Sequence, residues 1–389
     1  MIRGQLRTTA ALSLAVVAGL AMAACGGSST APASHAPTGP ATHSAAARRS
    51  GFEPAAASFV SSNLGWVLGQ SGCQSCAALR VTTDGGDRWA ALPAPPAPLG
   101  FAQPSAAAIT DIAFANLADG FLYGPGLLAT HDGGRSWVRQ NLPPVQALGI
   151  GAGYSYALTR QGGSWGLWRA AIGSGRWLAM PLPPRASPSP ASDYRTKLYV
   201  EGGTLALLRT GFFGPAVTPG EVGRLWLSTD DGMSWQLRHV PCRAPNGGGA
   251  AVLSIARGHP DAWLLDCFNN EQSSQQQNTQ HHLFGTVDAG LSWTRLPDPT
   301  SHNMPYSLAD NGSGHAFLAT VGARDFLVGT LDGGLHWRTM IISGGNFNGW
   351  ADLSFVTVQI GFVVAPTHYA REHLYRTQNG GRTWQTVNF

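Results

Sequence analysis

Two cysteines separated by two residues, Cys73-Gln-Ser-Cys76, form the spacing in this sequence that most directly suggests chemistry. A CxxC pair is typical of thiol–disulfide redox sites and of zinc sites. A redox pair of this kind expects a helix N-terminus, whereas the neighbouring residues here are typical of strands and turns. A zinc site needs two more ligands at good spacing, and the sequence has no second CxxC. The pattern therefore favours a local structural disulfide over either reactive site.

Acidic residues recur inside a short phrase, S/T-x-D-x-G-x-x-W, which we call the Asp-turn. Six good copies carry Asp84, Asp132, Asp230, Asp288, Asp332 and Asn379 at the acidic position, and a worn seventh copy spans residues 170–177. Asp, Ser and Thr side chains hydrogen-bond backbone amides two residues further on, which favours a turn. Because Asn379 replaces Asp in the last copy, we expect hydrogen bonding, not charge, to matter at this position.

Glycine and tryptophan complete each Asp-turn. The first Gly is replaced by Asp231 or Ala289 in two copies, whereas the second is kept as Gly86, Gly134, Gly232, Gly290, Gly334 and Gly381. We therefore predict a positive φ at the second position. The indoles are Trp89, Trp137, Trp235, Trp293, Trp337 and Trp384. Each is expected to open the next strand and to cover the edge of a sheet with apolar surface.

The elements that carry these turns repeat with them. An apolar strand such as Gly65-Trp-Val-Leu-Gly69 lies upstream of each Asp-turn, and each unit divides into four short strands. Four antiparallel strands per repeat are typical of a propeller blade. With 50 Gly and 26 Pro in 389 residues, a helical bundle is disfavoured. We predict an all-β fold, a seven-bladed β-propeller of four-stranded antiparallel blades; β-sandwich domains in tandem are the weaker alternative.

The Asp-turns make the chain resemble the Asp-box (BNR) propellers, which include sialidases, some glucan hydrolases, sorting receptors and the photosystem II assembly-factor family. The G-W-x-L-G element is most similar to that of the assembly factors, and the resemblance covers residues 52–389. It implies a closed ring in which the Asp-turns join the third and fourth strands of each blade, on the face away from the ligand-binding mouth. The Asp-turn carboxylates are then scaffold and not catalysts.

The resemblance also implies that long insertions lie together on the opposite face, the rim face. They are Arg209–Arg224, Phe268–Leu283, Ala94–Ser105, Pro184–Thr196 and Ser343–Trp350. Cys242 is expected in a connection between blades and Cys267 at the end of the next blade's second strand. Both would lie at this rim, so a Cys242–Cys267 disulfide between neighbouring blades is reasonable. Binding is expected here, with Arg209, Arg224, Phe347 and Trp350 as candidate rim residues. Phe347 and Trp350 could equally plug the rim.

Catalysis is weakly supported by the sequence. A sialidase would need three Arg side chains around a carboxylate, a Tyr–Glu pair and an acidic Asp, but the chain has five Glu and lacks the expected Arg-Ile-Pro motif. A glucan hydrolase of the Asp-box type uses a cleft between two propellers. His281 and His282 are adjacent and would point to opposite sides of a strand, which disfavours a metal site. We predict no catalytic residue, cofactor or metal; an exported glycoside hydrolase of the sialidase type is the alternative.

The N-terminal residues are typical of an export signal. Arg3 and Arg7 precede the apolar run of residues 8–24, and Cys25 follows Met-Ala-Ala as in a bacterial lipobox. We predict a signal peptide over residues 1–24, lipidation of Cys25, a disordered Ala/Pro/Ser/Thr-rich tether over residues 25–51, and the propeller over residues 52–389. An ordinary secretory peptide with an incidental Cys25 is the alternative. The four remaining Cys then fit two disulfides outside the cytoplasm.

Charge excludes one class of partner. The chain has 25 Lys and Arg against 21 Asp and Glu, a formal net charge of +4. This balance gives no electrostatic footprint for nucleic acid. We therefore expect an extracytoplasmic, membrane-anchored, monomeric binding or assembly scaffold that uses its rim loops on a protein or glycan ligand.

Overall fold

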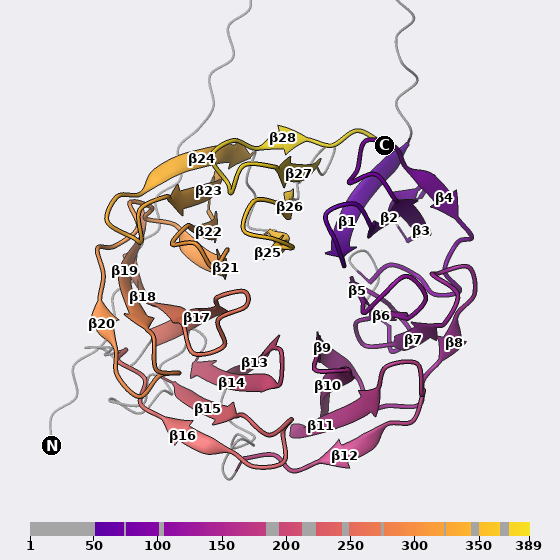
Figure 1. Ribbon diagram of the computed structural model, residues 1–389, viewed down its shortest axis with the longest axis horizontal. Helices are drawn as coiled ribbons and strands as arrows, with labels where there is room; N and C mark the ends of the chain where they lie inside the picture. Colours follow the sequence, from indigo (N-terminus) through magenta and orange to yellow (C-terminus); the bar gives the residue numbers. More distant parts are fainter. Residues whose placement is uncertain are drawn as a thin grey trace, which may run out of the picture. The chain divides into compact units, whose positions relative to one another are not determined.

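The chain folds into seven antiparallel sheets of four strands each, arranged as blades around a central axis (Figure 1). The four strands of every blade are consecutive in sequence and pair in that order, and Figure 1 shows the first strand innermost and the fourth outermost. The predicted seven-bladed β-propeller is confirmed. In this computed structural model the described residues are 51–73, 75–100, 105–183, 194–211, 223–242, 249–273, 276–322, 324–343, 350–365 and 373–389. The predicted signal peptide, Cys25 and the tether up to residue 50 lie outside them.

Blades 1 to 3 contain the first twelve strands. Blade 1 consists of β1 (Phe52–Phe59), β2 (Gly65–Ser71), β3 (Ala77–Thr82) and β4 (Ala90–Leu92). Blade 2 consists of β5 (Asp111–Phe114), β6 (Gly120–Tyr123), β7 (Leu127–Thr130) and β8 (Val138–Arg139). Blade 3 consists of β9 (Val145–Gly151), β10 (Tyr154–Gln161), β11 (Ser164–Ala171) and β12 (Leu178–Met180).

Blades 4 to 7 contain the other sixteen strands. Blade 4 consists of β13 (Tyr194–Glu201), β14 (Thr204–Gly211), β15 (Arg224–Ser228) and β16 (Gln236–Arg238). Blade 5 consists of β17 (Gly249–Ile255), β18 (Trp263–Ser273), β19 (Gln276–Thr286) and β20 (Thr294–Arg295). Blade 6 consists of β21 (Met304–Asp310), β22 (Ala316–Val321), β23 (Asp325–Thr330) and β24 (Arg338–Ser343). Blade 7 consists of β25 (Ala351–Phe355), β26 (Gly361–Ala365), β27 (His373–Thr377) and β28 (Gln385–Thr386).

The second strand of a blade is apolar on both faces because each blade packs against a neighbour on either side. All residues of β22 and β26 are buried, whereas both residues of the outermost strands β8, β20 and β28 are exposed. Such continuous apolar runs are typical of strands that are covered on both faces. The hydrophobic core therefore lies mainly between blades, and neighbouring blades hold each other in place.

The ring closes without a strand shared between its ends, since every blade is built from consecutive strands. Blade 7 instead packs on blade 1: the rings of Phe59 and Phe362 stack with centroids 3.4 Å apart. The backbone N–H of Ala57, on the inner edge of β1, donates to Oδ2 of Asp352 at 2.6 Å. A side chain of the neighbouring blade thus satisfies an edge group that β-sheets otherwise leave unpaired.

The predicted rim insertion Phe268–Leu283 is not a loop. The strands β18 and β19 continue pairing beyond the body of the blade, from Trp263↔Thr286 to Ser273↔Gln276. Cys267 accordingly lies within β18, not at the end of a strand as expected. The polar run pairs with itself because two strands that already leave the blade side by side can extend their ladder at little additional entropic cost. The result is a hairpin that extends the rim face at blade 5.

Candidate binding surface

The Asp-turns are saturated with hydrogen bonds. In blade 5 the Thr286 hydroxyl donates to Oδ1 of Asp288 at 2.6 Å and accepts from the N–H of Gly290 at 3.1 Å. Oδ1 of Asp288 also accepts from the N–H of Ser292 at 2.9 Å. The carboxylate thus caps an amide four residues on, not two as expected. The same bonds hold the turns of the other good copies.

These bonds favour the ionised form of the carboxylates. They lower the pKa of Asp132, Asp230 and Asp288 to about 2, chiefly through the hydroxyl of the serine four residues on. The pKa of Asp332 is lowered to about 2, chiefly by the backbone N–H of His336. A general acid or base works best with a pKa near the ambient pH. These carboxylates are therefore poorly suited to proton transfer and suited to holding turns.

The predicted positive φ at the second position is confirmed, since the six second-position glycines have φ between 77° and 99°. The first position also has a positive φ, but Asp231 (57°) and Ala289 (53°) hold it in the small left-handed region that L residues can adopt. Packing adds a constraint in some copies: a Cβ added to Gly381 would collide with the ring of Phe317, and one added to Gly134 would lie 2.9 Å from Leu79. The second glycine is therefore favoured by its φ in every good copy and by the preceding blade in some.

Some Asp-turn indoles join neighbouring blades. Nε1 of Trp235 donates to the carbonyl of Pro181, and Nε1 of Trp293 to the carbonyl of His239, each at 2.9 Å. Among the described residues the buried indole nitrogens without a partner include Trp137, Trp177, Trp337 and Trp384. The bond between blades is thus present at the blade 3–4 and blade 4–5 junctions and missing at others.

Both expected disulfides are present. Cys73 bonds to Cys76 across three positions, and Cys242 bonds to Cys267 across twenty-five. Cys242 lies in the connection after β16 and Cys267 on β18, so the second disulfide joins blade 4 to the base of the β18–β19 hairpin. This confirms the predicted staple between neighbouring blades.

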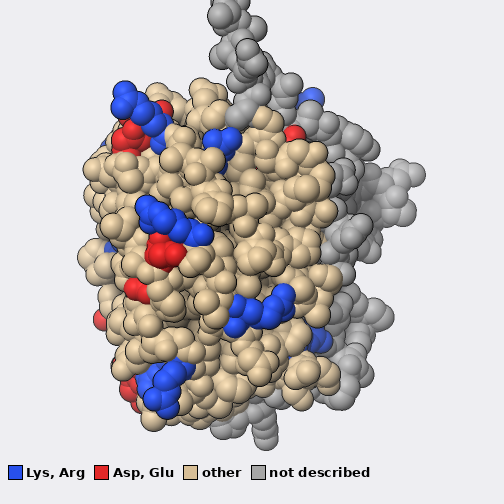
Figure 2. Space-filling model, turned by 90° about the vertical axis from the view of Figure 1, so that its right-hand side faces the viewer, with Lys and Arg blue, Asp and Glu red and all other residues tan. Residues whose placement is uncertain are grey.

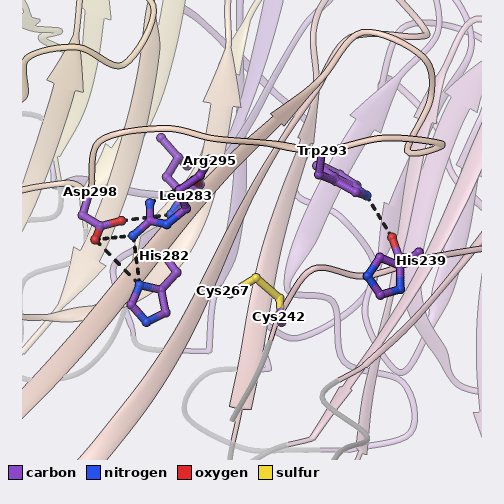
Figure 3. The surroundings of a disulfide bond; sticks show 8 residues. All are labelled: His239, Cys242, Cys267, His282, Leu283, Trp293, Arg295 and Asp298. Carbon is purple, nitrogen blue, oxygen red and sulfur yellow. Dashed lines mark hydrogen bonds and ion pairs between the residues drawn. A yellow bond between two sulfur atoms is a disulfide. The ribbon is translucent and has the colours of Figure 1, made fainter. Parts of the chain in front are cut away.

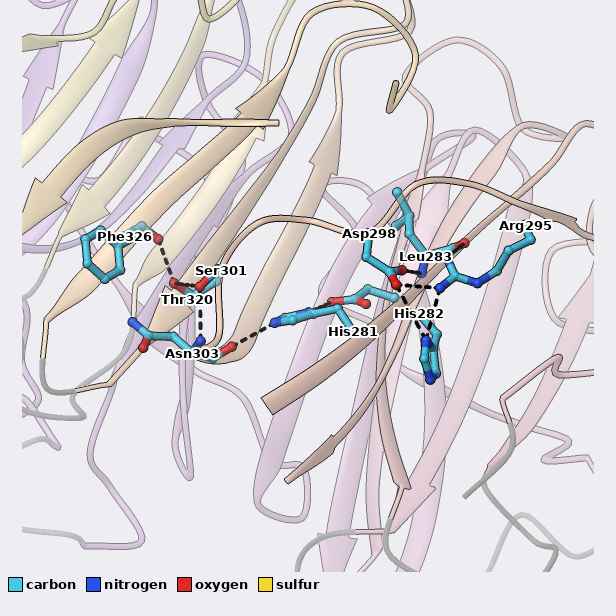
Figure 4. A network of polar contacts seen from close by, with 10 residues as sticks. His281, His282, Leu283, Arg295, Asp298, Ser301, Asn303, Thr320 and Phe326 are labelled. Carbon is cyan, nitrogen blue, oxygen red and sulfur yellow. Dashed lines mark hydrogen bonds and ion pairs between the residues drawn. The ribbon is translucent and has the colours of Figure 1, made fainter. Parts of the chain in front are cut away.

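A buried polar network fixes the other side of the hairpin base (Figure 4). Nδ1 of His281 lies 2.7 Å from Oδ2 of Asp266, and both side chains are at most 1% exposed. Nε2 of His281 lies 3.0 Å from the carbonyl of Asn303, in the connection to blade 6. The hairpin is therefore held from two sides, by a covalent bond to blade 4 and by hydrogen bonds to the blade 5–6 connection.

The two acceptors around His281 fix its protonation. A carbonyl oxygen only accepts, so Nε2 carries a proton, and Nδ1 also carries one when Asp266 is ionised. Burial alone would lower the pKa of His281, but the charge of Asp266 and the hydrogen bonds to Asp266 and Asn303 outweigh it and raise the pKa. The surroundings of His281 therefore favour its charged form, paired with Asp266 inside the protein.

An open cavity of about 470 Å³ lies beside the disulfide, at the junction of blades 4 and 5 (Figure 3). Its lining consists of His239, Pro241, His282, Phe284 and Arg295. This size and this mixture of apolar surface with a few polar groups are typical of ligand sites.

The polar wall of the cavity is linked by hydrogen bonds. Arg295 donates to Oδ2 of Asp298 at 2.6 Å, to the carbonyl of Leu283 at 3.1 Å and to Nδ1 of His282 at 3.0 Å. Since a guanidinium only donates, Nδ1 of His282 accepts, and its Nε2 carries the proton. Asp298 balances the charge of Arg295, so the wall offers hydrogen-bonding groups on a nearly neutral surface.

A pair of carboxyl groups lies on the inner strands of blades 2 and 7, away from this cavity. Burial raises the pKa of Asp111 on β5. Burial and the charge of Asp111 raise the pKa of Asp352 on β25 well above its usual value. Tyr123, directly opposite Asp111 in the sheet, has its pKa raised by burial and by both carboxylates. Sequence reasoning missed this pair because the two residues are 241 positions apart and belong to no repeated phrase.

The candidate rim residues predicted from the sequence are not among those that line the cavity beside the disulfide. Trp350 is 1% exposed and donates its indole N–H to the carbonyl of Thr320 at 3.1 Å, so it belongs to the core between blades 6 and 7 and is not an exposed anchor. Arg209 and Arg224 face each other as a strand pair of β14 and β15. Phe347 lies outside the described residues.

Neither metal sites nor membrane-spanning helices occur in the part of the chain that the structure describes. No group there of three or more His, Cys, Asp or Glu could hold a metal ion. His281 and His282 are separated by the strand as expected, one buried and the other half exposed. No described helix is long and apolar enough to cross a membrane.

Charges on the visible wall are scattered. In Figure 2 the wall seen from the side of blades 1 and 2 carries separate Lys or Arg side chains, several beside Asp or Glu, on an otherwise uncharged surface. A nucleic-acid site usually gathers Lys and Arg into a patch or stripe. This wall has no such patch.

Comparison with known proteins identifies the fold alone. No family model matches the chain, and no curated protein matches it. Among solved structures, YCF48 from Cyanidioschyzon merolae is 15% identical, with a TM-score of 0.52 over 87% of this chain and 96% of that chain. A GH74 xyloglucanase from Xanthomonas campestris is 15% identical, with a TM-score of 0.52 over 86% of this chain and 60% of that chain. A prolyl endopeptidase is 11% identical, with a TM-score of 0.55 over 87% and 50% of the two chains.

Proposed function

We propose that the chain is a non-catalytic binding scaffold that holds a partner protein at the rim face of blades 4 and 5. The observation that carries this proposal is the β18–β19 hairpin, whose base is fixed by the Cys242–Cys267 disulfide and by the His281–Asp266 pair. A surface whose base is held in place from two sides loses less conformational entropy on binding than a free loop does. The cavity of about 470 Å³ beside its base provides a place for a partner side chain.

The repeated phrase supports a scaffold role for the rest of the ring. We assign the Asp-turns to the Asp-box type, with Thr, Asp and Gly as a hydrogen-bonded turn and Trp as the cover of the blade edge. Solved propellers of similar fold include both hydrolases and YCF48. The choice between a hydrolase and a binding scaffold therefore depends on the residues of the site. There, the Asp-turn carboxylates are saturated with hydrogen-bond donors.

The protein is further proposed to act outside the cytoplasm, anchored by lipid on Cys25. The signal-like residues 1–24 and the lipobox-like residues before Cys25 support this location. Two disulfides are consistent with an oxidising compartment. In cells given a radiolabelled fatty acid, the wild-type chain should carry label in the membrane fraction, and Cys25→Ser should carry none. Label on the variant would contradict the anchor.

The binding role is tested by shortening the hairpin. Replacing residues 271–278 by Asn-Gly leaves Asn270 opposite Thr279 and closes a two-residue hairpin, with Asp266, Cys267 and His281 untouched. A photo-crosslinker at exposed Gln280 should attach the full-length chain to a membrane protein. The same group at Val138, 59% exposed on the outer strand of blade 2, serves as the matched control.

Two results decide this test. The proposal is supported if the crosslinker at Gln280 captures a protein that the crosslinker at Val138 does not capture, and if shortening the hairpin abolishes this capture. Equal capture from both positions, or capture unaffected by the shortened hairpin, contradicts it.

Glycoside hydrolysis is the second candidate, favoured by the Asp111–Asp352 pair. Two interacting carboxyls with raised pKa values resemble an acid and base poised to share a proton. Turnover of fluorogenic sialosides or other glycosides by the purified chain, abolished in Asp352→Asn, would favour this function. No turnover by the folded wild-type chain would leave the pair as part of ring closure.

A further inference from the structure

Apolar side chains project from the Asp-turns of three consecutive blades. Met233 in blade 4, Val287 and Leu291 in blade 5 and Leu335 in blade 6 are 56%, 84%, 69% and 61% exposed. They lie on the turn face, the face opposite the rim, because the connections between third and fourth strands share one edge of every blade. Single exposed apolar residues are ordinary, but a group on neighbouring turns indicates an interaction surface.

The same positions are charged elsewhere on this face. Arg135 in blade 2 and Arg382 in blade 7 occupy the place of Met233, Leu291 and Leu335. Their guanidinium groups fold back onto their own turns: Arg135 donates to the carbonyl of Asp132 at 2.7 Å and Arg382 to that of Asn379 at 3.0 Å. At this position of the Asp-turn the apolar residue is therefore confined to blades 4 to 6. Leu117 of blade 2 and Val358 of blade 7 are also exposed beside their Asp-turns, at 63% and 43%.

A cavity opens inside the apolar group. It has a volume of about 310 Å³, lies between the turns of blades 5 and 6, and is lined by residues that include Val287, Leu296, Gly333 and Trp337. Trp337 is 8% exposed, and its indole nitrogen has no partner among the described residues. At the preceding junction the equivalent indole, that of Trp293, bonds to blade 4. The space between the turns of blades 5 and 6 thus leaves room for a side chain from outside.

The three turns that carry the apolar group also carry negative charge, on carboxylates that lie outside the cavity lining. Asp230, Asp288 and Asp332 hold the three turns, and each keeps a pKa of about 2. They are therefore ionised at neutral pH. Nearby Arg238 is half-buried and donates its Nε–H to the carbonyl of Ala289 at 3.0 Å. An apolar surface edged by carboxylates complements a partner with apolar side chains next to basic ones.

We propose that the turn face of blades 4 to 6 is a second docking surface, which binds an amphipathic segment of a partner protein carrying Lys or Arg beside its apolar side chains. One large apolar side chain of that segment fills the cavity between blades 5 and 6 and acts as the anchor. This surface lies opposite the rim, so it is independent of the hairpin and of the function proposed for it.

The test uses the purified full chain and two labelled synthetic peptides with the same Leu and Phe residues, one carrying Lys and the other Glu. The Lys peptide should bind at least about tenfold more tightly in fluorescence anisotropy. The variant M233S/V287T/L291S/L335S should weaken its binding about tenfold or more. Hydrogen exchange with bound Lys peptide should show protection in residues 286–292 and 333–337.

The matched control is L117S/V138T/L178S, which removes three exposed apolar side chains from blades 2 and 3. It should leave binding of the Lys peptide within about twofold of the wild type. Because all substituted side chains are exposed, both variants should keep the wild-type unfolding temperature within about 2 °C.

Three results with the peptides would overturn the proposal: equal binding of both peptides, equal weakening in the control variant, or protection confined to the β18–β19 hairpin. A fourth result would also overturn it. In that case the Lys peptide does not bind, but the chain binds a second copy of itself or phosphatidylcholine vesicles, and the M233S/V287T/L291S/L335S variant abolishes this binding.

Discussion

Blades 7, 1 and 2 and blades 4 to 6 are built from the same repeat but differ in the kinds of contact that join them. On the first side, which we call the closed side, rings stack across both junctions: Phe59 on Phe362 at 3.4 Å and Trp66 on Phe114 at 3.7 Å between centroids. Arg376 of blade 7 also bonds to Asp87 of blade 1 at 2.9 Å.

On the second side, the open side, two cavities of about 470 and 310 Å³ lie at successive junctions. A disulfide and a buried His–Asp pair hold this side instead of stacked rings. The difference indicates that the two sides have different roles. The closed side brings the two ends of the propeller together, and the open side offers surfaces for partners. The disulfide adds to the apolar core that blades 4 and 5 share.

The largest difference between the sides should follow removal of His281. His281→Ala leaves Asp266 buried without its partner and should lower the free energy of unfolding by about 3–5 kcal/mol. On the closed side, Asp87→Ala removes only an ion pair whose acid is 67% exposed, because Arg376 keeps its hydrogen bond to the carbonyl of Gly85, and it should cost about 1 kcal/mol or less. Urea unfolding of both variants measures this, and equal losses would contradict the contrast.

The same residue should give the open side a pH dependence. The pKa of His281 is raised in the folded state, so its stabilising contribution is complete below the unfolded value of about 6.5 and is lost as pH rises through the raised pKa. Wild-type stability should therefore fall across that window, and His281→Ala should flatten the curve. An unchanged slope in the variant would show that another group titrates.

The two disulfides should contribute unequally. Cys242→Ser with Cys267→Ser opens a loop spanning 25 positions between blades and should cost about 3 kcal/mol. Cys73→Ser with Cys76→Ser, within one blade of the closed side, opens a loop spanning 3 positions and should cost about 2 kcal/mol. Thermal unfolding with and without reductant measures both. A larger loss for the pair in blade 1 would contradict the stapling role of the open-side disulfide.

Matched glycines test the packing difference directly. Gly134 and Gly334 hold the same Asp-turn position with φ of 90° and 92°, but a Cβ on Gly134 would lie 2.9 Å from Leu79 of blade 1, whereas one on Gly334 would lie 3.6 Å from Leu296 of blade 5. Gly134→Ala should therefore cost roughly 2 kcal/mol and Gly334→Ala about 1 kcal/mol. Equal costs in urea unfolding would mean that backbone strain alone governs both positions.

The sequence predicted the structural features that recur in every blade and missed most of the features that occur in one blade only. Thr286, Asp288 and Trp293 recur in register with other copies, so turn, blade and ring followed from local hydrogen bonding and spacing. The cysteine pairing followed from placing insertions on one face. The burial of Trp350 and the pairing of the polar hairpin did not, since both depend on contacts with neighbouring strands that no repeat records.

The cavities and the acid pair also escaped prediction, for a related reason. Asp111 and Asp352 interact only because the ring closes, and the cavity beside Trp337 depends on how the turns of blades 5 and 6 lie against each other. Exposed Met233 and Leu335 were visible in the repeat as variable positions. Their grouping on one side required the order of blades around the ring.

The smallest effect is expected at the acid pair. Burial raises the pKa of Asp352, so its ionisation is unfavourable in the folded protein. Asp352→Asn keeps an acceptor for the N–H of Ala57 without the charge, and should change stability at pH 7 by less than about 1 kcal/mol. Asp352→Ala should cost more, since it leaves that N–H unpaired. Urea unfolding at pH 7 measures both, and a large loss in Asp352→Asn would show that the carboxylate charge supports ring closure.

Hydrogen exchange of the full chain with the membrane protein captured through Gln280 tests the binding role of the open side most directly. Protection should appear in the β18–β19 hairpin and around residues 282–298, with blades 7, 1 and 2 unchanged. Protection on the inner strands of blades 1, 2 and 7, with the hairpin exchanging as in the free chain, would contradict it.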